Sequence, residues 1–167
     1  MTPPATADDL ANAPPPDTAA ESTAAGIHPL RDKPGHLVRC VQQRSATIFA
    51  EESREFGVTG PQHVIMVALA HNPGVDQNTV AALVDLDRST TGDVVARLER
   101  RGLIWREVNA ADRRGRQLFL SDSGRQMLQD MGPSVERTQD RFLAPLDPDE
   151  RREFVRLLRK MAALKTF

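Results

Sequence analysis

The chain has 167 residues, enough for one domain, and its 40% hydrophobic and 27% charged residues are typical of a soluble globular protein. No apolar stretch approaches the roughly 18 residues that a transmembrane helix needs, and no basic segment followed by an apolar run indicates a secretory signal. With a single cysteine, Cys40, an internal disulfide cannot form. We therefore expect a cytoplasmic protein.

The formal net charge of −1 hides an uneven distribution. Residues 88–116 carry eight arginines against four acidic residues, a net charge of +4, whereas residues 1–34 carry five acidic against two basic residues, a net charge of −3. A near-neutral total argues at first against nucleic acid as a partner. The basic stretch reverses that interpretation, because arginine is well suited to phosphates and base edges.

Residues 1–29 are rich in alanine, proline, threonine and aspartate, with only Leu10 and Ile27 as large apolar side chains. Such a segment cannot bury enough surface to offset its loss of conformational entropy, so we expect a disordered acidic tail. The apolar spacing then predicts a first helix over 35–56, which Gly57 would end. A second, buried helix should follow Pro61 and end before Asn72.

Two further short helices are predicted from their capping residues. Asp76 is suited to cap the first of them, which would turn Val80, Leu83 and Val84 inward, and Asp87 is suited to cap the second. In the second of these helices one side gathers Thr91, Val94, Val95 and Leu98. The opposite side gathers Ser89, Asp93, Ala96, Arg97 and Arg100. The short turn between the two helices is typical of a helix-turn-helix.

Two strands are predicted after this helix pair, over 103–108 and 117–120, on either side of a polar turn over 109–116. A helix-turn-helix followed by such a hairpin is a winged helix. A long helix is predicted over about 122–144, and Asp147, Pro148 and Glu150 together form a start signal for a last helix.

The apolar stripes of the first and last helices exceed what a small winged helix can cover, which favours a homodimer. We therefore predict a mainly α fold with a small β-hairpin wing. A winged helix-turn-helix over 61–121 would lie between an N-terminal dimerisation helix over 30–60 and C-terminal dimerisation helices over 122–167.

From residue 35 to residue 165 the sequence resembles the MarR family of bacterial transcription regulators. The similarity is strongest from Asp76 to Gly124 and includes the runs Leu86–Thr91, Val94–Ile104 and Asp112–Arg116. The segment His36–Arg44 is similar to members that govern aromatic-acid catabolism. The resemblance implies a dimeric, ligand-responsive repressor of transcription rather than an enzyme.

The resemblance implies that the Asp87-capped helix enters the major groove of double-stranded DNA. Its candidate contacts are Arg88, Ser89, Thr90, Asp93 and Arg97. The resemblance places the wing in the minor groove with Arg113, Arg114 or Arg116 inserted, and implies that Asp112 pairs with an arginine. Gln77 and Thr79 are candidate phosphate contacts. The alternative for all of these is an ordinary solvated surface. A homodimer would read a pseudo-palindromic operator.

Family members bind a small anionic aromatic molecule between the dimerisation helices and the winged helix. Here His36, Arg39 and Gln43 share one side of the first helix, and His63 and Met66 on the second helix could complete a wall. Arginine pairs with carboxylates, and histidine and glutamine bond ring substituents. The alternative is a polar helix side that binds nothing.

Cys40 offers a second trigger, because some relatives sense peroxides through a cysteine on this helix. Those relatives support the sulfur with tyrosines, which this chain lacks, and a lone cysteine is more often a small buried apolar residue. The histidines form no tight metal-ligand cluster, so we expect no metal and no cofactor. A winged helix that binds protein instead of DNA is a further alternative. Ser89, Ser121 and Ser123 lack the histidine and aspartate neighbours of a hydrolase.

Overall fold

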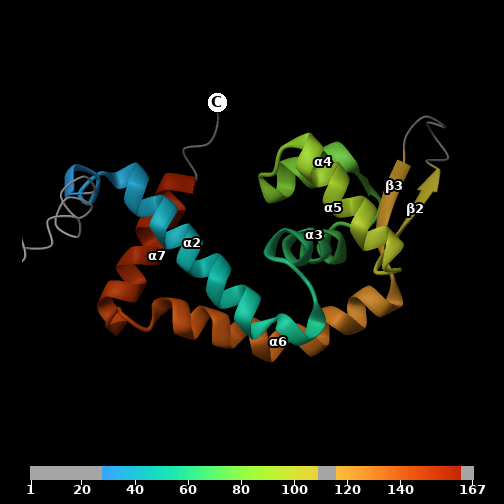
Figure 1. Cartoon of the computed structure of the whole chain (residues 1–167). Helices are drawn as coiled ribbons and strands as arrows, with labels where there is room; N and C mark the ends of the chain where they lie inside the picture. The colour runs from blue at the N-terminus through green and yellow to red at the C-terminus, as the bar shows by residue number, and fades with distance from the viewer. Residues whose placement is uncertain (1–27, 109–115, 163–167) are drawn as a thin grey trace, which may run out of the picture. The chain divides into compact units, whose positions relative to one another are not determined.

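The computed structural model describes residues 28–108 and 116–162 (Figure 1). The tail predicted over 1–29 and the turn predicted over 109–116 therefore lie outside the described residues, except at 28, 29 and 116. The chain divides into two compact units, residues 1–42 and residues 43–167. Each unit is described by itself.

In the first unit the described residues form a 3₁₀ helix, η1 (His28–Leu30), and the beginning of helix α2 (Pro34–Glu52). The amide of Lys33 donates to the carbonyl of Leu30, and the amide of His36 donates to the carbonyl of Lys33. Leu37, Val38 and Val41 are exposed on this part of α2. Exposed apolar side chains that are grouped on one helix mark a surface that contacts another helix or molecule.

The first predicted helix ends earlier than expected. Helix α2 ends at Glu52 and is followed by a separate 3₁₀ helix, η2 (Arg54–Phe56). The chain turns there because Gly57 adopts the left-handed conformation, with φ of 58°, which glycine tolerates at no steric cost. Gly57 is thus a terminator, as the sequence indicates, but of the 3₁₀ turn rather than of the long helix.

The second unit contains the winged helix. Its helices are α3 (Gly60–His71), α4 (Gln77–Val84) and α5 (Arg88–Arg100), and its strands are β1 (Val75–Asp76), β2 (Ile104–Val108) and β3 (Arg116–Leu120). Strands β2 and β3 form the predicted antiparallel hairpin, with Ile104 opposite Leu120. Strand β1 was not predicted, because two residues are too few to show a strand pattern. It pairs with β3 and gives the sheet order β1-β3-β2.

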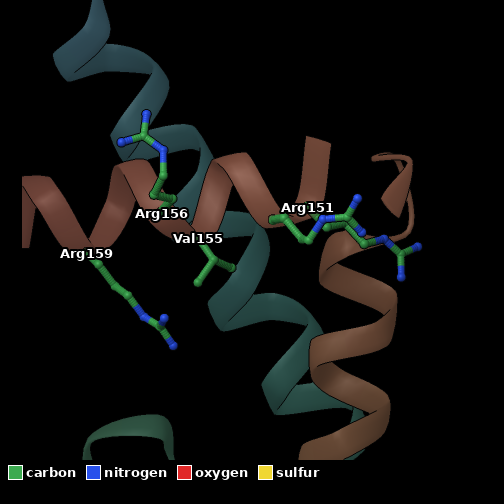
Figure 2. A pocket seen from close by; sticks show the side chains of 5 residues that line it. Arg151, Val155, Arg156 and Arg159 are labelled. Atoms are coloured by element: carbon green, nitrogen blue, oxygen red, sulfur yellow. The ribbon is translucent and has the colours of Figure 1, made fainter. Parts of the chain in front are cut away.

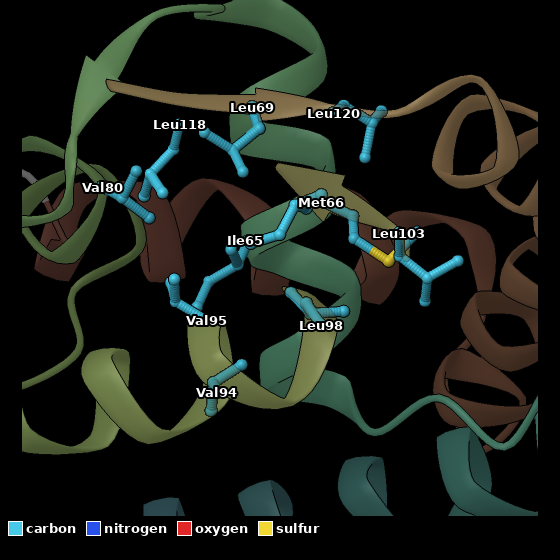
Figure 3. Close-up of a cluster of buried hydrophobic side chains, with 11 residues drawn as sticks. Ile65, Met66, Leu69, Val80, Val94, Val95, Leu98, Leu103, Leu118 and Leu120 are labelled. Carbon is cyan, nitrogen blue, oxygen red and sulfur yellow. The ribbon is translucent and has the colours of Figure 1, made fainter. Parts of the chain in front are cut away.

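The hydrophobic core of the winged helix lies between α3, α4, α5 and the sheet (Figure 3). Ile65, Met66, Leu69, Val95 and Leu98 are almost completely buried at its centre. Leu118 and Leu120 close it from β3. Burial on this scale is the dominant source of stability in a small domain.

The predicted faces of α5 are confirmed. Its buried residues are Thr91, Val94, Val95 and Leu98, and the opposite residues Ser89, Asp93, Ala96, Arg97 and Arg100 are exposed. The prediction for α4 is wrong at one position, because the side chain of Leu83 is 51% exposed. Val80 and Ala81 are the buried pair of α4, which turns Leu83 away from the core.

Two long helices follow the wing, α6 (Asp122–Leu143) and α7 (Pro148–Ala162), close to their predicted limits. Asp147 caps α7 as the sequence indicates, since its side chain accepts from the amides of Asp149 and Glu150. Within the described residues of α7 no side chain is buried. Among the described helices, none is both long and apolar enough to cross a membrane.

Candidate nucleic-acid interface and effector cavity

The N-terminus of α5 is fixed by Asp87. One carboxylate oxygen accepts from the amide of Thr90 at 2.8 Å, and the other accepts from the hydroxyl of Thr90 at 2.6 Å. The Thr90 hydroxyl and amide lower the pKa of the Asp87 carboxyl, so it is ionised at neutral pH. The cap therefore occupies Thr90 and leaves its exposed neighbours Arg88 and Ser89 available to a partner.

Helix α4 is capped in the same way, because Asp76 accepts from the amide of Thr79 at 2.8 Å. The side chain of Gln77 lies against α5, where its Nε2 atom would be 3.2 Å from a Cβ placed on Gly92. Gln77 therefore contacts the neighbouring helix, whereas Thr79 is exposed. Of the two phosphate candidates, Thr79 is the more accessible.

The arginines of the basic stretch do not all face solvent. Arg106 on β2 forms an ion pair with Glu99 on α5, with Nε 2.9 Å from Oε2, although the N–H is not aligned for a hydrogen bond. Arg101 donates to two backbone carbonyls of the α2–α3 connection. Arg88, Arg97 and Arg100 on α5 and Arg116 on β3 are exposed. Asp112, Arg113 and Arg114 lie outside the described residues.

The base of the wing is held by an aromatic pair. The rings of Trp105 on β2 and Phe119 on β3 stack with centroids 4.4 Å apart and planes inclined by 14°. Directly paired residues on neighbouring strands are the main side-chain contribution to hairpin stability. Together with the ion pair of Arg106, this stack ties the wing strands to each other and to α5.

The residues predicted to contact an effector fall into both units. In the first unit His36 Nε2 lies 3.4 Å from Cys40 Sγ, and Arg39 is exposed. Cys40 is exposed, so the expectation of a buried cysteine is wrong. In the second unit Gln43 is exposed. Met66 is completely buried in the winged-helix core, where its packing leaves it no open surface to present to a ligand.

His63 is half-buried on α3, and its ring lies 5.5 Å from that of Phe49 on α2. Burial lowers the pKa of His63, because the charged imidazolium loses hydration there. The ring is therefore neutral at physiological pH. A neutral imidazole both donates and accepts a hydrogen bond.

A cavity of about 490 Å³ lies beside Phe49 in the second unit. Its walls come from the end of α2, from η2 and from the start of α3, and most are small or apolar. They are Ala46, Phe49, Ala50, Ser53, Arg54, Gly57, Val58, Thr59, Gly60 and Pro61. None of the sequence-predicted ligand residues lines it, and its small side chains carry no motif that sequence reasoning could have used.

A second hollow, of about 510 Å³, is lined by Val155 and four arginines of α7 (Figure 2). Arg156 is held by Glu153, and Arg151 donates to the carbonyl of Leu146. Arg156 and Arg159 point away from each other (Figure 2). These arginines therefore do not converge on a single anion.

The winged helix of this chain has known relatives. The MarR family model matches residues 56–115. The transcriptional regulator HosA of Escherichia coli O157:H7 is 33% identical over 132 residues, which cover 79% of this chain and 96% of HosA. The chain belongs to the MarR family of transcriptional regulators. The predicted family is thereby confirmed, and the prediction that the chain is not an enzyme agrees with relatives that are regulators.

Solved structures confirm the fold. PcaV of Streptomyces coelicolor, in complex with its natural ligand, is 39% identical with a TM-score of 0.71, covering 80% of this MarR-family chain and 94% of PcaV. Bordetella bronchiseptica BpsR, whose DNA binding is regulated by 6-hydroxynicotinic acid, is 31% identical with a TM-score of 0.72, covering 78% and 94%. The repressor CouR, bound to a 23-mer DNA duplex, is 28% identical with a TM-score of 0.75, covering 81% and 96%.

Proposed function

We propose that this MarR-family protein is a homodimeric repressor that reads a pseudo-palindromic operator and is released from it by a small aromatic carboxylate. Helix α5 enters the major groove and the wing enters the minor groove. The ligand favours a form of the dimer in which the two copies of α5 no longer match the operator, as coupled equilibria require.

The two faces of α5 carry the proposal for DNA binding. Val95 and Leu98 hold one face in the core, while Arg88, Ser89 and Arg97 are exposed on the other. Arginine can donate two hydrogen bonds to guanine, and serine can bond phosphates or bases. A helix whose polar face only contacts water would not need two arginines and a serine next to a wing. CouR, a relative of similar fold, is a repressor bound to a DNA duplex.

The wing supplies the second contact in this proposal. The family resemblance implies that Arg113, Arg114 or Arg116 enters the minor groove and that Asp112 pairs with an arginine and shapes the turn. A narrow, A·T-rich minor groove attracts arginine through its enhanced negative potential. In a symmetric dimer the two copies of α5 would meet half-sites about 34 Å apart.

The cavity beside Phe49 supports the proposal for the effector. Phe49 offers an aromatic wall and Arg54 offers a cation, the two features that recognise a small aromatic carboxylate. The ring of His63 lies 5.5 Å from the ring of Phe49. His36, Arg39 and Gln43 stay predicted ligand contacts on sequence grounds. BpsR, a relative, is regulated by an aromatic acid.

Operator binding is tested by selecting duplexes from fragmented genomic DNA and footprinting them. We expect Arg97→Ala and Arg114→Ala each to weaken binding of the selected operator and to reduce the slope of log affinity against log salt by about one. Arg44→Ala removes an exposed arginine from α2 and serves as the control, with unchanged affinity. If the full-length protein selects no duplex, the proposal fails and protein binding by the winged helix becomes the better interpretation.

The effector is tested by thermal denaturation with a panel of aromatic carboxylates that includes benzoate. We expect one compound to raise the melting temperature and, at the same concentration, to dissociate the operator complex, because ligand binding stabilises the state that it prefers. If every compound leaves both measurements unchanged, the aromatic effector is refuted.

A redox trigger is the second candidate, and the exposure of Cys40 beside His36 is the observation that favours it. An exposed thiol is accessible to oxidation by peroxide. Hydrogen peroxide should then release the operator from the natural protein but not from Cys40→Ser. Equal release from both, or release from neither, rejects this alternative.

A further inference from the structure

Arg101 connects the C-terminal end of α5, the proposed recognition helix, to the wall of the cavity. Its Nη1 atom donates to the carbonyl of Gly57 at 2.6 Å, and its Nη2 atom donates to the carbonyl of Phe56 at 2.9 Å. The planar fork of a guanidinium presents two donors in a fixed geometry to two adjacent acceptors, whereas lysine donates from a single nitrogen. The Arg101 amide in turn donates to the carbonyl of Arg97, so the residue is fixed to the end of α5.

The backbone segment to which Arg101 donates, Phe56–Gly57, forms part of the cavity wall. Gly57 lines it, as do Ser53 and Val58 on either side. The hydroxyl of Ser53 bonds the carbonyl of Phe49, and the amide of Gly57 bonds the carbonyl of Arg54. These local bonds, and the left-handed conformation of Gly57, restrict the segment to few arrangements. A side chain or ligand that enlarges the cavity therefore displaces the Phe56–Gly57 backbone as a unit.

We infer that Arg101 is a positioning residue that transmits occupancy of the cavity to the recognition helix. The inference rests on the proposed function, because it assigns the regulation of the same protein. Displacement of the two carbonyls moves the guanidinium, and the guanidinium moves the C-terminal end of α5. Val94 and Val95 hold the preceding part of α5 in the hydrophobic core, so a shift at its C-terminal end changes the angle of the helix rather than its length. Within the basic stretch Arg101 thus acts inside the protein, not on DNA.

A double-mutant cycle tests this coupling without an identified ligand. Ala50→Leu adds a side chain to the cavity wall and imitates an occupant. Arg101→Met removes both donors and keeps an unbranched side chain in place of the aliphatic part of arginine. We expect Ala50→Leu to weaken operator binding about fivefold in the natural background, the lower limit of typical allosteric coupling. In the Arg101→Met background it should weaken binding less than twofold, within the range of ordinary additivity.

Arg100→Met is the matched control, because it removes the same charge from the adjacent residue. Arg100 bonds the carbonyl of Ala96 within its own helix and does not hold the α2–α3 connection. The effect of Ala50→Leu should therefore persist in this background. Equal effects of Ala50→Leu in the natural and Arg101→Met backgrounds, or no effect in the natural background, overturn the inference.

The operator for these measurements is selected with the natural protein. Failure to select any duplex refutes the proposed function, whereas selection without coupling refutes only the role of Arg101. Hydrogen exchange gives a measurement that needs no Arg101 variant. The amide of Leu103, which donates to the carbonyl of Leu98 at the end of α5, should exchange faster in Ala50→Leu than in the natural protein. Unchanged exchange contradicts the inference.

Discussion

The winged helix and helix α7 differ in how far their apolar side chains are buried. In the winged helix Ile65, Val95 and Leu98 are completely buried by neighbours from the same chain. In α7 Leu157 and Leu158 are each 43% exposed, and Met161 is 58% exposed. Both regions have regularly spaced apolar residues in the sequence. Only the winged helix buries them against other residues of the same chain.

This difference indicates which region is self-sufficient. A domain that closes its core folds by its own contacts, whereas an exposed apolar stripe gains its stability when a second surface covers it. In the proposed homodimer that surface is the second copy. Four substitutions test whether the winged helix and α7 differ in this way.

The junction between the winged helix and α6 depends on Gly124. A Cβ at this position would lie 2.2 Å from the carbonyl oxygen of Leu103 and 2.6 Å from Cδ1 of Leu120. We expect Gly124→Ala to lower the free energy of unfolding by about 3 kcal/mol in urea denaturation, the cost of severe overpacking. Gly132→Ala on the same helix has no atom within 4 Å of the new Cβ and is the control. Similar values for the two variants would contradict a closely packed junction.

The apolar stripe of α7 should hold the dimer together. Leu158→Glu is expected to raise the dissociation constant of the dimer at least about tenfold, or ~1.4 kcal/mol, because a charge would be buried without a partner. Sedimentation or light scattering against concentration measures the change. Lys160→Glu places the same charge on the same helix away from the stripe and should leave the dimer intact. Equal behaviour of the two variants would show that the stripe is not an interface.

The N-cap of α5 stabilises the winged helix through hydrogen bonds rather than through apolar burial. Asp87→Ala should lower the free energy of unfolding because the helix loses its N-cap, and Asp93→Ala on the same helix should be near neutral. Because hydrogen bonds from Thr90 lower the pKa of the Asp87 carboxyl, the stabilisation is present above the ordinary pKa of aspartate and is lost as the pH falls through the lowered one. A cap with no pH dependence in acid would contradict this account.

Substitution of His63 should give the smallest change in the free energy of unfolding. Burial lowers its pKa, so the folded protein binds fewer protons than the unfolded chain near the ordinary pKa of histidine. Stability should therefore be at its full value above that pKa and should decrease as the pH falls through it. His63→Gln should flatten this part of the curve. Denaturation at several pH values between about 5 and 8 makes the comparison.

The sequence predicted the features that depend on interactions between residues close together in the chain. The caps Asp76, Asp87 and Asp147 and the two faces of α5 follow from hydrogen bonds and periodicity within a few residues. Leu83 was misplaced, because the faces of a short helix depend on what packs against it. The DNA contacts on the wing and the ligand contacts on α2 stay predictions from the sequence.

The family, the order of the helices and the wing, and the polar face of α5 follow from the amino-acid sequence alone. The folded chain adds the bonds from Arg101 to carbonyls 44 and 45 residues away, the close contact of Gly124 with Leu103, and the cavity that small side chains line beside Phe49. Helical periodicity and capping act between neighbours in the chain and leave a pattern there. Contacts between distant segments depend on how the helices pack, and no short stretch of sequence records them.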